Sequence, residues 1–157
     1  MKDRAPISPY HLDWPSALGT FLMNFGTLHY LVVVFLKDNL APTEFAGFKD
    51  RHFQDQVKRV ETFLRDTGFP AEQQEEFTQL RRRLDPLRNL RNHIAHGYML
   101  YRSGLGGEAE AVSICLPKDL DLEYSPETIH ITFAELLASL DALTESIEGL
   151  KRFVGFK

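Results

Sequence analysis

The segment Leu87-Arg88-Asn89-Leu90-Arg91-Asn92-His93-Ile94-Ala95-His96-Gly97 is where the pattern of this chain changes. Apolar side chains recur at helical spacing through Leu87, Leu90 and Ile94, and the helix is expected to stop at Gly97. From Tyr98 the period shortens to that of strands, over residues 98–102 and 111–116. The segment therefore predicts a junction between a helical bundle and a small β-hairpin.

Four main helices are expected around this junction, at about 13–39, 44–66, 70–97 and 133–154. Asp13 and Thr43 can cap the first two, and Thr132 can cap the last. A further short strand is expected at 129–131. The fold class is thus mainly α: an up-down helical bundle of four to five helices with a small β-hairpin inserted before the last helix.

Helix ends and breaks are marked by particular residues. Thr132 and Glu135 have the spacing of a capping box. Gly68 is expected in a left-handed C-cap, and Pro86 is expected either to kink the third helix or to begin a new one. We expect one domain over residues 1–157, with a loose arm at 1–12 and an insert at 98–131 that contains a flexible connection at 103–107.

The composition is that of an ordinary globular protein. The chain has 157 residues, 43% hydrophobic and 25% charged, with a net charge of −4. This balance argues against nonspecific coating of nucleic acid. The single Cys115 excludes an intramolecular disulfide or a cysteine-cage metal site, so a cytoplasmic location is expected.

A long stretch from Trp14 to Leu36 carries no acidic or basic side chain apart from His29. Its length would allow it to span a bilayer. However, small and polar residues interrupt it, and its flanks show no clear charge asymmetry. We therefore expect a buried central helix and no membrane or signal segment, with His29 as a hydrogen-bonded core histidine.

The helix before Gly97 is expected to have a polar face. At about 100° per residue, Asn89, Asn92, His93 and His96 cluster on the side opposite the leucines. Asn92 and His96 are an i, i+4 pair that can touch. Such side chains bind phosphate or a nucleobase edge, although a polar helix end with histidine and glycine is also a common structural feature.

Arg91 does not share that face. It lies on the apolar stripe, about 140° from His96 on an ideal helix. A buried arginine is costly unless it is paired. Arg91 should therefore meet an acidic partner, or the stripe should open there onto a groove or a subunit interface.

Arg91-Asn92, followed after three residues by His96, resembles the Arg-x(4–6)-His motif of the HEPN superfamily. In that superfamily a polar residue, often Asn, follows the arginine, and the ending Ile94-Ala95-His96-Gly97 is similar to many bacterial members. The motif falls at the end of the third of four main helices, as it does in the superfamily. The resemblance covers about 14–97 and 133–154, and the hairpin insert departs from the common pattern.

The resemblance implies a homodimer formed through the motif helices and a metal-independent endoribonuclease whose cleft takes motifs from both subunits. Carried over, His96 would transfer protons at the attacking 2′-hydroxyl or the leaving 5′-oxygen. Arg91 would stabilise charge on the phosphoryl group, and Asn92 would orient His96 or the phosphate. His93 has no fixed role in the superfamily and is expected either to transfer protons or to face solvent.

The sequence also predicts residues that bind RNA. Together with His93 and Asn89, a local basic patch is expected at Arg88, Arg81, Arg82 and Arg83. The alternative is a solvated face paired with Glu75 and Glu76. No metal or other cofactor is expected, because His93 and His96 have no carboxylate beside them on that face.

The function predicted from the sequence is an endoribonuclease of the toxin or phage-defence kind. Its expected partners are RNA, a second copy of the chain and a cognate antitoxin. The main alternative is a non-catalytic HEPN-like dimer that binds nucleotides, RNA or a protein partner. A membrane-associated helical protein is a third class, which depends on residues 14–36 alone.

Overall fold

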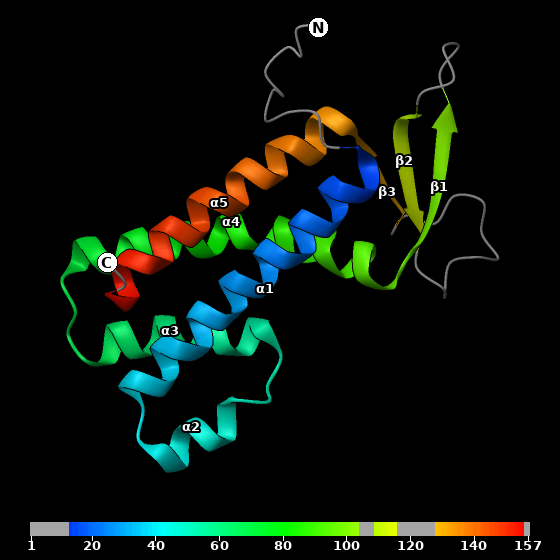
Figure 1. Cartoon of the computed structure of the whole chain (residues 1–157). Helices are drawn as coiled ribbons and strands as arrows, with labels where there is room; N and C mark the ends of the chain where they lie inside the picture. The colour runs from blue at the N-terminus through cyan, green and yellow to red at the C-terminus, as the bar shows by residue number, and fades with distance from the viewer. Residues whose placement is uncertain (1–12, 104–108, 116–127, 156–157) are drawn as a thin grey trace, which may run out of the picture.

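The computed structural model describes residues 13–103, 109–115 and 128–155 (Figure 1). The helices are α1 (Trp14–Asn39), α2 (Pro42–Phe48), α3 (Phe53–Asp66), α4 (Ala71–His96) and α5 (Phe133–Val154). The strands are β1 (Tyr98–Ser103), β2 (Ala109–Cys115) and β3 (Ile129–Thr132). The arm expected at 1–12 and most of the connection expected at 103–107 lie outside the described residues.

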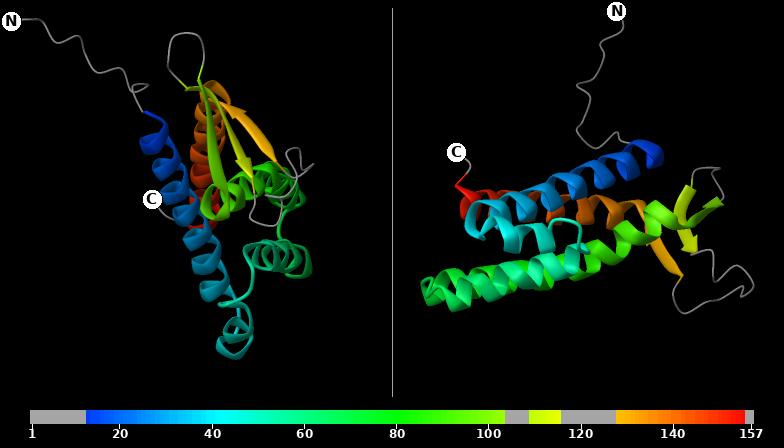
Figure 2. Two further views of the ribbon diagram at one scale, coloured as in Figure 1. Left: turned by 90° about the vertical axis from the view of Figure 1, so that its right-hand side faces the viewer. Right: turned by 90° about the horizontal axis from the view of Figure 1, so that it is seen from below.

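The chain forms a helical bundle with a three-stranded antiparallel sheet, in the order β1-β2-β3, before its last helix. This confirms the predicted fold class, and β3 is the short third strand that was expected. Figure 2 shows the sheet at one end of the bundle, beside the last turn of α4. Tyr98 of β1 lies opposite Cys115 of β2, and Ser113 of β2 lies opposite His130 of β3.

Ring contacts give the directions of the helices. Phe25 and Phe35 of α1 meet Phe53 and Phe63 of α3 in the same order, at centroid distances of 5.1 and 5.8 Å, so α1 and α3 run parallel. Between them α2 and the segment after it carry the chain back along the bundle (Figure 1). In contrast, α4 runs antiparallel to α3, since its Arg88 bonds to Gln54 and its Arg81 pairs with Glu61.

Helix α1 is central to the core. By length and composition it is the one helix in the described chain that could cross a membrane, and it packs its inner face inside the bundle. The buried residues of that face are Trp14, Ala17, Leu18, Phe21, Phe25, Leu28, Leu31, Val32, Phe35 and Leu36. The core accounts for the apolar residues of that face, whereas Met23 and Tyr30 of the same helix are exposed.

The single helix expected at 44–66 is wrong, because the chain leaves helical geometry at residues 49–52 and forms α2 and α3 instead. Thr43 is also not the cap: Ala41 occupies the N-cap and Pro42 begins α2. Gln56 explains the break. Its side chain is fully buried, and its Nε2 donates to the backbone oxygens of Phe48 and Lys49 at 3.0 and 3.1 Å.

Other predicted helix signals are confirmed. The Asp13 side chain accepts from the Ser16 backbone N–H at 2.9 Å, and Thr132 and Glu135 form the capping box of α5. Gly68 has a φ of 71°, in the left-handed region that favours glycine. Helix α4 runs on through Pro86 without a new start and ends at Gly97.

Candidate functional site

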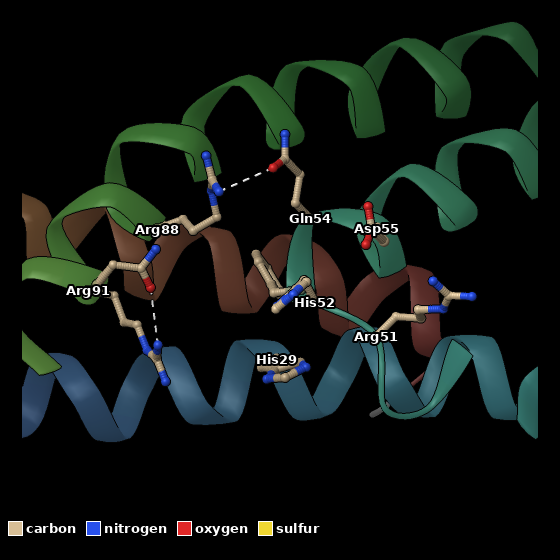
Figure 3. Close-up of a pocket in the computed structure, with 9 residues that line it drawn as sticks. His29, Arg51, His52, Gln54, Asp55, Arg88 and Arg91 are labelled. Atoms are coloured by element: carbon tan, nitrogen blue, oxygen red, sulfur yellow. Dashed lines mark hydrogen bonds between the residues drawn. The ribbon is translucent and has the colours of Figure 1, made fainter. Parts of the chain in front are cut away.

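A cavity of about 460 Å³ lies between α1, the segment 49–52 and the facing turns of α3 and α4 (Figure 3). Helix α4 contributes one side of it and α1 the floor. Its lining is mostly polar or charged and consists of His29, Arg51, His52, Phe53, Gln54, Asp55, Arg88, Arg91 and Asn92. The break between α2 and α3 creates this cavity, because it places Arg51 and His52 opposite α4.

The cavity is cationic. Three guanidinium groups line it, and Asp55 supplies the one carboxylate in the lining. Across the described residues, no carboxylate oxygen lies within 4 Å of the side-chain nitrogens of Arg51, Arg88 or Arg91. By contrast, Arg59 and Arg81 form ion pairs with Glu44 and Glu61. The cavity therefore gathers three guanidinium groups that have no carboxylate partner among the described residues.

Arg91 is half-buried and reaches from α4 toward α1 (Figure 3). Its Nη1 donates to Oδ1 of Asn92 at 3.1 Å, and its Cζ lies 6.0 Å from the centroid of the Phe25 ring. A cation within about 6 Å of the centroid of an aromatic ring is attracted to the face of that ring. Of the alternatives that the sequence left open for Arg91, the groove is present and the described residues supply no acidic partner, whereas the subunit interface stays a prediction.

Arg88 has unused hydrogen-bonding capacity. Its Nη1 donates to Oε1 of Gln54 at 3.2 Å, which holds the side chain across to α3. Its Nε is buried, and no acceptor for it exists among the described residues. A guanidinium has five N–H donors, so Arg88 retains donors for a ligand or a partner.

His29 is tied to the same framework. Both donors of the Gln56 amide are used by the Phe48 and Lys49 carbonyls, so its Oε1 accepts a hydrogen bond from the Nε2–H of His29 at 2.7 Å. This fixes the neutral imidazole as the Nε2–H tautomer and makes its Nδ1 an acceptor. The predicted hydrogen-bonded histidine is thus confirmed, and it also lines the cavity.

The structure divides the predicted catalytic residues. Arg91 and Asn92 line the cavity, whereas His96 is exposed at the end of α4 and is not part of the lining. Asn92 bonds to Arg91, and no hydrogen bond joins it to His96 within the described chain. The two ends of the motif therefore face different surroundings within one chain.

The placement of His93 on a polar face is wrong. Its side chain is 4% exposed, and its Nδ1–H donates to the backbone oxygen of Asn89 at 2.9 Å. Helix α4 contacts α1 and α3 and also α5, β1 and β2, so more of its surface is covered than a single apolar stripe predicts. Asn89, by contrast, is exposed, as its place on the polar face predicts.

The predicted basic patch is divided among different surroundings. Arg81 is paired with Glu61, Arg82 and Arg83 are exposed, and Arg88 lines the cavity. The alternative pairing with Glu75 and Glu76 is also wrong, since Glu75 accepts from Gln79 and Glu76 pairs with Arg152. Of the four arginines, only Arg88 joins Arg91.

Sequence reasoning missed Arg51, His52, Gln54 and Asp55 as members of the cavity. Their positions depend on the break at 49–52, where the sequence has neither glycine nor proline. One signal was present: Gln56 is a polar residue within the apolar stripe of α3, between Phe53 and Val57. A buried amide needs partners, and here those partners are the carbonyls at the end of α2.

Comparisons with protein-family models, curated proteins and solved structures found no match to this chain. The assignment of a function therefore depends on the geometry of the site and on the motif.

Proposed function

We propose that this chain is a metal-independent endoribonuclease that acts as a dimer, with a site composed of Arg91 and Asn92 from one chain and His96 from the other. One observation supports this most strongly. The motif helix presents Arg91, without a carboxylate partner among the described residues, in a cationic cavity, and it presents His96 exposed at its end. These are the two chemical groups that metal-free RNA cleavage uses.

The chemistry is an internal transfer at phosphorus. The 2′-oxygen of the ribose attacks the adjacent phosphorus while the bond from phosphorus to the 5′-oxygen breaks, which leaves a 2′,3′-cyclic phosphate and a 5′-hydroxyl. His96 takes the proton from the 2′-hydroxyl or supplies one to the 5′-oxygen, and water carries out the other proton transfer. Arg91 stabilises the charge that develops on the phosphoryl oxygens, and Asn92 orients the Arg91 guanidinium through its Oδ1.

A second subunit resolves the separation of the two groups. Five residues of helix turn His96 about 140° away from Arg91, so one straight helix directs them to different sides. A two-fold axis near the end of α4 would bring His96 of one chain to Arg91 of the other. This arrangement fits a HEPN-like toxin or phage-defence enzyme of the cytoplasm, held in check by a cognate antitoxin.

The second candidate is a non-catalytic binding module of the same HEPN-like kind. The observation that favours it is the position of the cavity, whose three guanidinium groups lie away from His96. Such a module would bind a nucleotide or RNA and turn nothing over.

Cleavage of mixed RNA by the purified chain in excess EDTA tests the proposal. We expect products with 2′,3′-cyclic phosphate ends, and rates lowered by about 100-fold or more in Arg91→Ala and His96→Ala. Arg65→Ala, which removes an exposed arginine of α3 outside the motif and outside the predicted basic patch, is the matched control and should retain activity. Activity that persists in both motif variants, or its absence over a broad set of RNAs, favours the binding module.

A further inference from the structure

The cavity beside α4 has the dimensions of a ligand site. Its volume of about 460 Å³ lies within the roughly 300–1,000 Å³ typical of pockets for small molecules and cofactors. It is lined from three separate parts of the chain, α1, residues 51–55 and α4, so folding must be complete before it exists.

The charge of the lining selects an anion. The lining contains three arginines, Arg51, Arg88 and Arg91, and one carboxylate, Asp55, in a chain whose net charge is −4. Planar guanidinium groups bind phosphate oxygens in bidentate fashion, and several of them together match a doubly charged phosphate monoester. In an acidic chain, a cationic cavity of this size favours a local phosphate group over a long stretch of nucleic-acid backbone.

The cations are held in place before any ligand arrives. Gln54 holds Arg88, the Gly47 carbonyl accepts from Nε of Arg51 at 3.2 Å, and Asn92 accepts from Arg91. Gln56 fixes the segment that carries Arg51 and His52. Grouping unpaired cations lowers the stability of the fold because like charges repel. Sites that keep such an unfavourable arrangement are commonly functional.

We propose that this cavity binds a terminal phosphate group, carried either by a free nucleotide or by a phosphorylated end of RNA. Arg88 and Arg91 would bind its oxygens from α4, and Arg51 would bind from the opposite side. The cavity excludes His96, so this binding does not require cleavage. It shares only Arg91 and Asn92 with the nuclease site proposed above.

Titration calorimetry at constant ionic strength tests the inference with AMP, adenosine and inorganic phosphate as probes. We expect AMP and phosphate to bind one site per chain, and adenosine to bind at least about tenfold more weakly because it lacks the charged group. Arg88→Gln and Arg51→Gln should each weaken AMP binding by about tenfold or more. Arg65→Gln, at an exposed arginine of α3 outside the cavity and outside the predicted basic patch, should change it by less than about twofold.

A second set of titrations identifies the source of the phosphate. The His96→Ala protein is titrated with one short RNA bearing either a 5′-phosphate or a 5′-hydroxyl. Tighter binding of the phosphorylated RNA than of AMP identifies an RNA end, and the reverse order identifies a free nucleotide. Arg51 is exposed on its segment, so Arg51→Gln remains informative even where Arg88→Gln unfolds the chain.

Two results overturn the inference: no saturable binding of any phosphate probe, or an equal loss of affinity in Arg65→Gln and in the two cavity variants. The nuclease proposal fails separately. Phosphate binding without RNA cleavage removes the nuclease and leaves the phosphate site, whereas cleavage without phosphate binding does the opposite.

Discussion

Gln56 is the residue on which the shape of the cavity depends. Its buried amide joins the end of α2 to α1 through three hydrogen bonds, to Phe48, Lys49 and His29. We predict that Gln56→Leu lowers the free energy of unfolding by roughly 1–3 kcal/mol, because His29 Nε2 and the Lys49 carbonyl lose their hydrogen-bond partner, whereas the Phe48 carbonyl still accepts from the Arg51 N–H. Urea denaturation measures this change.

The matched control for Gln56→Leu is Gln73→Leu, at an exposed position in the first turn of α4. We expect it to change the free energy of unfolding by no more than about 0.5 kcal/mol. Equal effects of the two substitutions would show that the buried amide does not hold the segment 49–52.

His93 and His96 have opposite roles although they are three residues apart. His93 is buried and bonded to the Asn89 carbonyl, whereas His96 is exposed. We predict that His93→Ala lowers the free energy of unfolding by about 2–3 kcal/mol and that His96→Ala changes it by less than about 0.5 kcal/mol. Urea unfolding of the two variants side by side measures the difference, and a larger effect for His96→Ala contradicts it.

At the scale of the element, α5 begins at a capping box whose strength depends on pH. The Thr132 backbone N–H and hydroxyl both donate to Glu135, at 2.7 and 2.8 Å, and hold the pKa of its carboxyl below the ordinary 4.5. A lowered pKa in the folded state means that the carboxylate stabilises the fold above pH 4.5. That contribution is lost as the pH falls through the lowered value.

The prediction concerns the difference in Tm between the natural chain and Glu135→Gln. We expect the difference to be constant above pH 4.5 and to shrink below it, as the natural carboxylate takes up its proton. Melting curves followed by circular dichroism from pH 3 to pH 7 measure it. A difference that grows as the pH falls contradicts the role assigned to Glu135.

The helix ends and the helix break differ in how far the sequence could predict them. Asp13, Thr132 with Glu135, and Gly68 act through neighbours within a few residues, so local pattern was sufficient. The break at 49–52 is maintained by a side chain that reaches back from α3 to the end of α2. Contacts of that kind depend on tertiary packing, which helical periodicity does not report.

At the scale of the whole molecule, the sequence predicted one wall of the cavity. Arg91, Asn92 and Arg88 belong to a single helix, and the mismatch between Arg91 and the apolar stripe indicated a groove. The opposite wall, with Arg51 and His52, faces α4 only because α2 returns the chain along the bundle. The sequence also predicted the wrong face for His93, because the sheet and α5 cover α4 through tertiary contacts as well.

The central claim is that two chains build each cleavage site, and mixing two inactive variants tests it most directly. Arg91→Ala and His96→Ala are each purified, shown to lack cleavage of RNA in EDTA, then mixed in equal amounts and left to exchange subunits. Half of the dimers should then be mixed, each with one intact site of two, so about a quarter of the natural activity should return. A mixture that stays inactive after exchange, or a single variant that cleaves at the natural rate, would contradict the composite site.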